Sequence, residues 1–235
     1  MTNDKRALNF IASAFFDYTA SRFLLINNHP LNGIILASTA IEKYLKALSI
    51  IATGKYEKGH FDKFEKLLKV FVGTPLESMF NSADPQFFDA LSGGYQLRYF
   101  DNTYEIWKVS FVTKQVLAEL DYFINEIEKW IVVSDGVDNL TTYKMAVRNN
   151  DTRIYDNNYV LNNWDKKTFV ETESNSFALF SDPANSVIEL VGSKLCFPYS
   201  GRMTTFIIQI EGQDPIATTE FERRLIEAKL EGEKS

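Results

Sequence analysis

The chain has 235 residues, with 31 acidic against 25 basic side chains. The length suits one or two domains, and the negative balance excludes a global positive field that would draw the protein to nucleic acid or to a membrane surface. Cys196 is the single cysteine, so an internal disulfide and a multi-cysteine zinc site are excluded. No apolar run approaches the roughly 20 residues that span a bilayer, and the amino terminus lacks an apolar signal core. We therefore expect a cytoplasmic protein with no membrane association.

Two amphipathic helices are predicted at the start of the chain. In residues 4–26 apolar side chains recur at spacings of three and four, and Arg22 lies in their stripe. The aliphatic part of the Arg22 side chain can lie along the core and place the guanidinium group in solvent, or the guanidinium group can form an ion pair inside a bundle. The segment 27–30 ends this helix, because the position before Pro30 disfavours helical backbone.

The second helix is centred on residues 37–48 and is the most strongly patterned part of the chain. Its apolar positions cover several sides, which predicts contacts with several other helices. One arc is polar, and we call it the polar strip: Ser38, Thr39, Glu42, Lys43, Lys46 and Ser49. We expect the polar strip to face solvent, where Glu42 four residues before Lys46 is a favourable surface pair.

Further helices are predicted up to residue 131. A third helix follows His60 at residues 61–72, and short helical pieces are predicted at residues 76–80 and 86–91, before a loop at 92–94. A long helix over residues 103–131 keeps a seven-residue apolar period. Residues 1–133 are therefore predicted to form an antiparallel helical bundle.

The pattern changes to a period of two after residues 134–136. Alternation at residues 143–147 predicts a strand, followed by a turn and a second strand at 153–155. Further strands are expected at residues 169–170, 177–180, 187–191, 194–197 and 203–210, with a tight hairpin turn at 192–193. A capping box at residues 219–222 predicts a terminal helix. The predicted class is α+β, in which residues 137–235 form a mainly antiparallel β domain of unknown role.

Motifs of common enzyme classes are absent from the sequence. There is no phosphate-binding loop, no dinucleotide fingerprint and no nucleophile elbow. With only His29 and His60 there is also little imidazole for metal binding or proton transfer. We therefore predict no metal site and no cofactor.

Four fragments in order form a recognisable set: D-Y-T-A-S-R-F-L-L at 17–25, A-S-T-A-I-E-K-Y-L-K-A-L at 37–48, His60 with Leu67, and Y-Q-L-R-Y-F-D at 95–101. Over about residues 8–130 they resemble the HEPN domain, a helical bundle. The resemblance implies a homodimer formed through the bundle, and a nucleotidyltransferase-type partner in a toxin-antitoxin or defence module. It also implies, for many members, metal-independent ribonuclease activity through an Arg-x4-6-His motif.

The residues that match the family's motifs are Glu42, Lys43, Lys46, His60, Leu67, Arg98, Tyr99 and Asp101. Phe100 stands where the family usually has proline, and no histidine follows Arg98. Arg22 and His29 fit the ribonuclease spacing only formally, at the end of the first helix. Metal-free RNA cleavage needs a general base near neutral pH and a cation for the phosphate. We therefore predict a non-catalytic protein.

In that prediction Lys43, Lys46, Arg98 and Tyr99 contact a nucleotide or RNA. Structural roles are the alternative for each, with Arg98 paired to Glu42 or Asp101 and Tyr99 in the core. Two other functions stay open. One is a dimeric protein-interaction module with no nucleic-acid role, and the other is a cryptic ribonuclease that uses Arg98 and His60 as catalytic residues.

Overall fold

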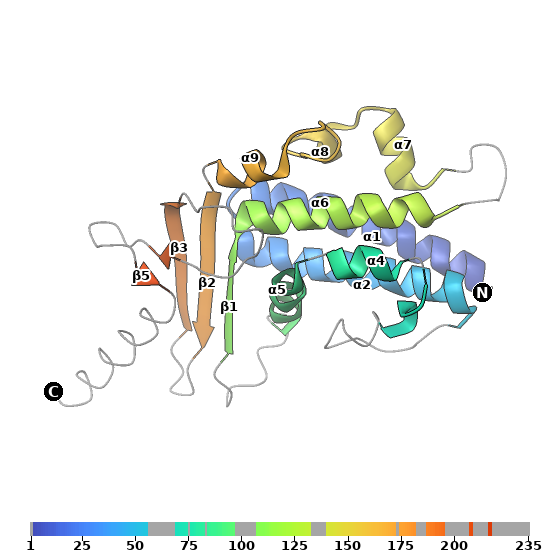
Figure 1. Cartoon of the computed structure of the whole chain (residues 1–235), viewed down its shortest axis with the longest axis horizontal. Coiled ribbons are helices and arrows are strands. Elements are labelled where there is room, and N and C mark those ends of the chain that lie inside the picture. Colours follow the sequence, from blue (N-terminus) through green and yellow to red (C-terminus); the bar gives the residue numbers. More distant parts are fainter. Residues whose placement is uncertain are drawn as a thin grey trace.

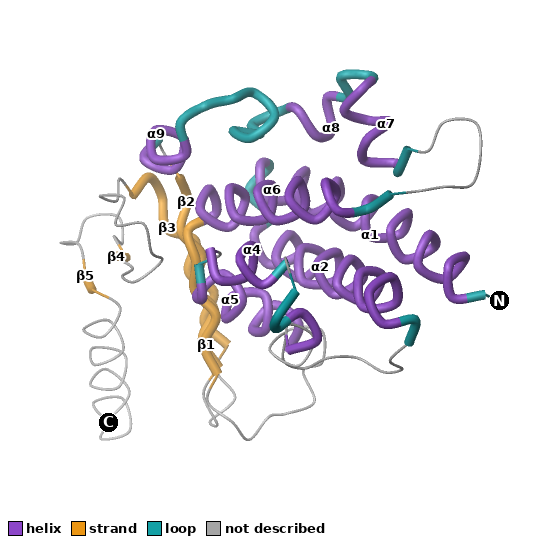
Figure 2. The backbone as a smooth tube through the Cα atoms, turned by 45° about the vertical axis from the view of Figure 1, so that its right-hand side comes forward, coloured by secondary structure: helices purple, strands orange, loops and turns teal. Residues whose placement is uncertain are grey.

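The computed structural model describes residues 2–55, 69–74, 76–82, 84–96, 107–132, 140–172, 174–181, 187–195, 207–208 and 216–217. Within these ranges, α1 (Asn3–Ile26), α2 (Pro30–Thr53) and α6 (Thr113–Trp130) form a bundle (Figure 1). Helices α7 (Thr142–Arg148), α8 (Thr152–Tyr155) and α9 (Lys166–Glu171) follow one another along the outer side of α6. A sheet of β1 (Trp107–Val112), β2 (Ser174–Ser181) and β3 (Val187–Leu195) stands at one end of the bundle. Figure 2 shows the same arrangement from a second direction, with the sheet beside the bundle rather than within it. The N-terminal helices pack together, as the sequence predicts.

Helices α1 (Asn3–Ile26) and α2 (Pro30–Thr53) form the hairpin at the centre of the bundle. Thr2 caps α1 by accepting a hydrogen bond from the Lys5 N–H, and Pro30 opens α2 at a position where no N–H is needed. Gly54 ends α2 in the left-handed conformation, with φ of 66°. Both predicted helices are confirmed, with bounds close to those expected.

Helices α4 (Glu77–Ser82) and α5 (Pro85–Gln96) confirm the two short helical pieces. The predicted loop at 92–94 is wrong, because these residues continue α5. A Cβ atom at Gly94 would lie 2.9 Å from Ile34 Cγ1 and 3.0 Å from the Ile34 carbonyl oxygen, so glycine here allows α5 to approach α2 closely. Residues 69–71 form the short helix η1 (Lys69–Phe71), and the rest of the predicted third helix, with His60, lies outside the described residues.

The long helix predicted at 103–131 is wrong in its first part. Residues 107–112 form strand β1 (Trp107–Val112), and only then does α6 (Thr113–Trp130) begin. β1 pairs antiparallel with β2 from Trp107 opposite Ser181 to Val112 opposite Ser176. Aromatic and β-branched residues favour strands, and pairing with a distant segment outweighs the local helical period.

The segment after the bundle is helical where strands were predicted. Residues 143–147, 153–155 and 169–170 lie in α7 (Thr142–Arg148), α8 (Thr152–Tyr155) and α9 (Lys166–Glu171). Each helix has a side-chain cap, since Thr141, Asp151 and Asp165 accept hydrogen bonds from backbone N–H groups two or three residues later. These caps satisfy orphan donors at helix starts, and they outweigh the short alternation of apolar residues.

Strands β2 (Ser174–Ser181) and β3 (Val187–Leu195) complete a three-stranded antiparallel sheet in the order β1-β2-β3. The predicted strands at 177–180 and 187–191 are confirmed. The hairpin turn predicted at 192–193 is wrong, because β3 runs through it with a register shift between Ser174 and Ser176. Such an irregularity inserts extra residues into one strand without ending it. Short strands β4 (Ile207–Ile208) and β5 (Ile216–Ala217) pair with each other, and the predicted terminal helix lies outside the described residues.

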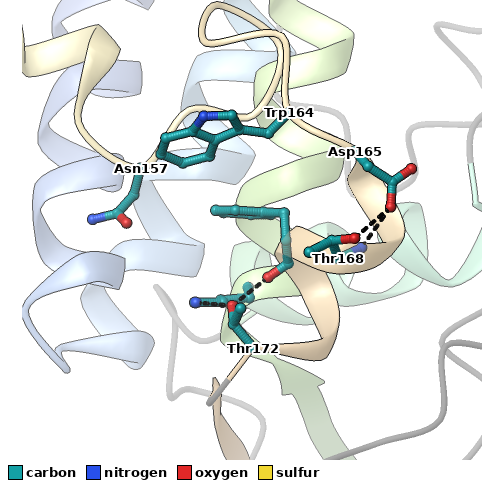
Figure 3. Close-up of a pocket in the computed structure, with 7 residues that line it drawn as sticks. Asn157, Trp164, Asp165, Thr168 and Thr172 are labelled. Atoms are coloured by element: carbon teal, nitrogen blue, oxygen red, sulfur yellow. Dashed lines mark hydrogen bonds between the residues drawn. The ribbon is translucent and has the colours of Figure 1, made fainter.

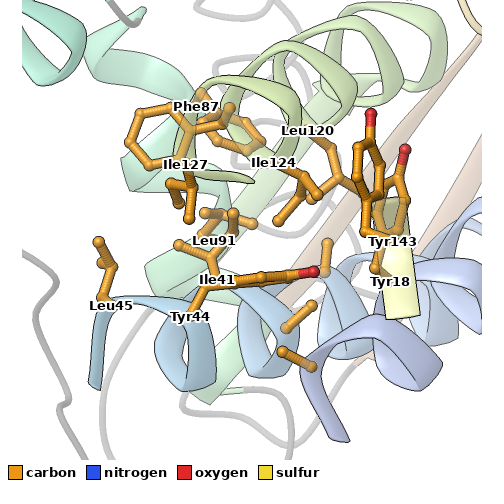
Figure 4. Close-up of a cluster of buried hydrophobic side chains, with 14 of the residues drawn as sticks. Tyr18, Ile41, Tyr44, Leu45, Phe87, Leu91, Leu120, Ile124, Ile127 and Tyr143 are labelled. Atoms are coloured by element: carbon orange, nitrogen blue, oxygen red, sulfur yellow. The ribbon is translucent and has the colours of Figure 1, made fainter. Parts of the chain in front are cut away.

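One apolar core joins the bundle to the segment that follows it. Tyr18, Ile41, Tyr44, Phe87, Leu120, Ile127 and Tyr143 converge between α1, α2, α5, α6 and α7 (Figure 4). Because Tyr143 comes from α7, residues beyond the predicted boundary at 133 contribute to the core of the bundle.

Candidate functional site

The polar strip of α2 is mostly buried, which corrects the expectation that it faces solvent. Ser38, Glu42, Lys46 and Ser49 are each less than 9 % exposed. The cause is that α1, α5 and α6 all contact α2, so this helix lies at the centre of the bundle. Only Thr39 and Lys43 of the strip are partly exposed.

The two lysines of the polar strip, which are predicted to contact a nucleotide or RNA, are both ion-paired. Lys46 Nζ lies 2.7 Å from Glu42 Oε1, and both side chains are less than a tenth exposed. Lys43 Nζ lies 2.6 Å from Asp17 Oδ2 and donates to Ser13 Oγ on α1, with 26 % of its side chain exposed. The two lysines share a helix but pair with different carboxylates. Arg98, Tyr99 and His60 lie outside the described residues.

Arg22 is at the centre of a buried polar network between α1, α6 and α8. Its Nη1 donates to Asp121 Oδ2, and neither side chain is exposed. Its Nε donates to the Arg153 carbonyl oxygen at 3.3 Å, and its Nη2 donates to that of Asp156. Tyr18 OH donates to the second oxygen of Asp121 at 2.8 Å.

The charges of this network are set by burial and by the ion pair. Burial raises the pKa of Asp121, and Arg22 opposes part of that rise. Burial acts most strongly and would lower the pKa of Arg22, but the charge of Asp121, the electrostatic effect of Tyr18 and the hydrogen bonds to both together outweigh it, so the pKa is raised. Of the two sequence interpretations of Arg22, pairing inside the bundle is confirmed. Since His29 is exposed at the start of α2, the Arg22 and His29 spacing brings no catalytic pair together.

A second buried carboxylate, Glu128, holds the segment after the bundle against α6. It accepts hydrogen bonds from Tyr44 OH at 2.8 Å and from Thr141 Oγ1 at 2.6 Å. Burial raises the pKa of Glu128, and the two hydroxyl donors oppose the rise. Both carboxylates are enclosed and satisfied by protein groups, which indicates a structural role.

An open pocket of about 430 Å³ lies where α9 packs near the start of α6. It is lined by Lys114, Asn157, Trp164, Asp165, Thr168, Phe169 and Thr172. Figure 3 shows Trp164 above the pocket, with Asp165 and Thr168 on one side and Asn157 and Thr172 on the other. Lys166 Nζ donates to Glu119 Oε1 at 2.5 Å, and this ion pair anchors α9 to α6.

This pocket is not predicted from the sequence, because Phe169 is assigned there to a strand and no helix is expected at residues 166–171. A signal was present, since Asp165 three residues before Thr168 is typical of a helix start. Asp165 Oδ1 accepts hydrogen bonds from both the N–H and the Oγ1 of Thr168 at 2.8 Å. These bonds lower the pKa of Asp165, so the carboxylate is ionised at neutral pH.

The described ranges contain neither a metal-ligand cluster nor a membrane-spanning helix. No group of three or more histidine, cysteine, aspartate or glutamate side chains there could hold a metal ion. No helix in the same ranges is long and apolar enough to cross a bilayer.

Comparisons with known proteins identify no relative. No family model matches the chain, and neither a curated protein nor a solved structure is significantly similar to it.

Proposed function

We propose that this chain is a non-catalytic helical module of the HEPN type that pairs with a second copy of itself through the outer face of α1. The supporting observation is an exposed apolar line on that helix. Phe16 is 59 % exposed and Phe23 is 65 % exposed. They are seven residues apart, two helical turns, and therefore share one face with the exposed Ala20 between them. We call Phe16, Ala20 and Phe23 the α1 stripe.

The α1 stripe is complementary to itself. If two copies of α1 cross antiparallel about a twofold axis midway between the phenylalanines, Phe16 of one copy meets Phe23 of the other. The small Ala20 lies close to that axis and lets the two backbones approach. Twofold interfaces use the same patch on both subunits, and aromatic side chains bring the largest apolar area to such contacts.

The size of the stripe predicts a weak dimer. Even if the whole outer face of α1 is buried, its 24 residues give a length of about 36 Å and, with a contact width of about 10 Å, an upper limit of roughly 360 Å² on each partner. Stable interfaces bury about 800 Å² on each partner. Because even this upper limit is about half of that, we expect a dissociation constant in the micromolar range.

Sedimentation equilibrium across about 1 to 200 µM, the range around a micromolar dissociation constant, tests the proposal. The wild type should pass from monomer to dimer, and the double variant Phe16→Ser/Phe23→Ser should stay monomeric throughout. Val132→Ser is the matched control, since Val132 is an exposed apolar side chain outside the stripe. A monomeric wild type at the highest concentration, or a dimer that the double variant leaves intact, would refute the proposal.

Binding of a nucleotide or RNA at α2 is the second candidate function. It is favoured by Lys43, because the Lys43 and Asp17 pair is near enough to the surface for a phosphate to replace the carboxylate. Arg98 and Tyr99 are further contacts proposed from the resemblance, together with a nucleotidyltransferase-type partner, whereas Lys46 is buried in its pair with Glu42. RNA binding should then weaken as salt is raised and weaken further in Lys43→Ala and Arg98→Ala.

The cryptic ribonuclease is separated from simple binding by a cleavage assay. Purified wild type should bind labelled RNA without cutting it if only the binding function is present. Cleavage that is lost in both His60→Ala and Arg98→Ala would instead assign a catalytic role to these two residues. If RNA does not bind at any salt concentration, both nucleic-acid functions are excluded, whereas the self-association proposal is unaffected.

A further inference from the structure

The pocket beside α9 has an exposed aromatic wall on a buried aromatic base. Trp164 is half exposed, and its ring centre lies 6.3 Å from that of Phe169 at an interplanar angle of 32°. Phe169 is buried and in turn stacks on Tyr159 with centres 5.8 Å apart. Aromatic rings prefer offset stacked or edge-on partners at such separations. Trp164 therefore offers a ring face to the pocket from a supported position.

The charges around the pocket are separated. The Lys114 ammonium donates to Thr172 Oγ1 and lies 5.3 Å from the centre of the Phe169 ring. The carboxylate of Asp165 is held by Thr168 on the opposite side of the pocket from Thr172 (Figure 3). An anionic group would therefore be attracted to the Thr172 end and repelled from the Asp165 end.

We propose that this pocket binds a small planar aromatic molecule that carries one anionic group. The ring stacks on Trp164, and the anion lies at the Lys114 and Thr172 end, where the Asn157 amide supplies a further hydrogen-bonding group. The positive charge of Lys114 attracts a bound anion through space, whichever groups accept hydrogen bonds from its ammonium. The volume of about 430 Å³ falls within the roughly 300 to 1,000 Å³ typical of small-molecule sites. The α1 stripe is not involved, so this proposal and the proposed self-association stand or fall separately.

The test uses the full chain and the indole N–H signals in a ¹⁵N-labelled NMR spectrum. The chain has three tryptophans, so Trp164→Phe assigns the resonance of interest. The probes are two aromatic anions, indole-3-acetate and adenosine monophosphate, with indole-3-acetamide and adenosine as their neutral counterparts. At least one anion should shift the Trp164 resonance and bind about 3- to 10-fold more tightly than its neutral counterpart. This ratio lies between the effect of an exposed ion pair and that of a charge-assisted hydrogen bond. Whichever anion binds more tightly distinguishes a carboxylate from a phosphate ligand.

Matched variants test the two walls of the pocket. Trp164→Ala should weaken binding about 2- to 12-fold, as expected for a lost aromatic pair. Because this variant lacks the Trp164 signal, its binding is followed by the backbone N–H signals of Thr168 and Thr172, which line the same pocket. Lys114→Met should reduce the affinity for the anion to that for the neutral counterpart and leave the neutral one unchanged. Lys167→Met is the control, because Lys167 is exposed on α9 but does not line the pocket. No shift of the Trp164 resonance by any probe at about 5 mM, a concentration above the weakest useful affinities, would overturn the proposal. The proposal would also be overturned if charged and neutral probes bound equally well, or if Lys167→Met reduced the affinity for the anion as much as Lys114→Met.

Discussion

Replacing Arg22 by methionine should destabilise the fold more than any surface charge substitution. Arg22 and Asp121 are both completely buried, and the pair links α1 to α6. Removal of one partner from a buried ion pair costs about 3 to 5 kcal/mol, because the other charge stays buried without compensation. The carbonyl oxygens of Arg153 and Asp156 also lose a donor at partly buried positions, which adds to this cost. Against a typical total of about 5 to 15 kcal/mol, the expected loss is a large fraction of the stability.

The double variant Arg22→Met/Asp121→Leu separates loss of the pair from creation of an unpaired charge. With both charges gone, the stability should return to within about 2 kcal/mol of wild type, since apolar replacements of buried pairs are often tolerated. Tyr18 OH loses its acceptor in this variant but keeps the contact with Asn158 Nδ2 at 3.4 Å. The coupling energy between the two positions should therefore be at least about 1 kcal/mol.

Urea unfolding followed by circular dichroism at 222 nm measures these free energies. Arg153→Met is the control, because Arg153 pairs with Asp151 at the surface and more than half of its side chain is exposed. Its loss should cost no more than about 1 kcal/mol. If Arg22→Met costs no more than Arg153→Met, or if the double variant is less stable than Arg22→Met alone, the role assigned to the buried network is wrong.

Two further predictions concern the buried polar groups of α6 and α2. Burial raises the pKa of Glu128 above 4.5, so the native state keeps the Glu128 proton at higher pH than the unfolded state does. The contribution of Glu128 to the free energy of unfolding therefore falls as pH rises from about 4.5 through the native pKa. Glu128→Gln should remove that decline. Urea titrations between about pH 4.5 and 8 should therefore show that the free energy of unfolding of the variant falls less steeply with pH than that of the wild type. An equal or steeper fall would contradict the role assigned to Glu128. Lys46→Ala should cost about 1 to 3 kcal/mol, because Glu42 is buried beside it, and a thermal melt indistinguishable from that of wild type would show that the pair is not enclosed.

The first two helices could be predicted from local sequence because their signals are local. Apolar side chains repeat at helical spacing over 24 residues in each, and Pro30 separates them. The helices after residue 140 also have a local signal, in the caps at Thr141, Asp151 and Asp165, but short runs of apolar alternation in the same segment favour strands. A run of three or four alternating residues is weak evidence for a strand, whereas a cap satisfies particular backbone groups.

Other features have no local signal. Strand β1 exists because residues 107–112 pair with residues more than 60 positions later, and nothing within the segment specifies that partner. Gly94 looks like a loop residue until Ile34 of α2 is placed against it.

The candidate sites show the same division between local and long-range information. The sequence pattern predicts that Lys43 and Lys46 lie on one polar arc of one helix, and both residues do lie in α2. Whether that arc meets water depends on how many helices surround α2, and within the described residues α1, α5 and α6 contact it. The pocket likewise requires Lys114 from α6 and Trp164 from a segment about 50 residues later to come together. Helical periodicity is encoded within a few turns of chain, but burial and pocket formation depend on contacts between distant segments, which only the tertiary structure decides.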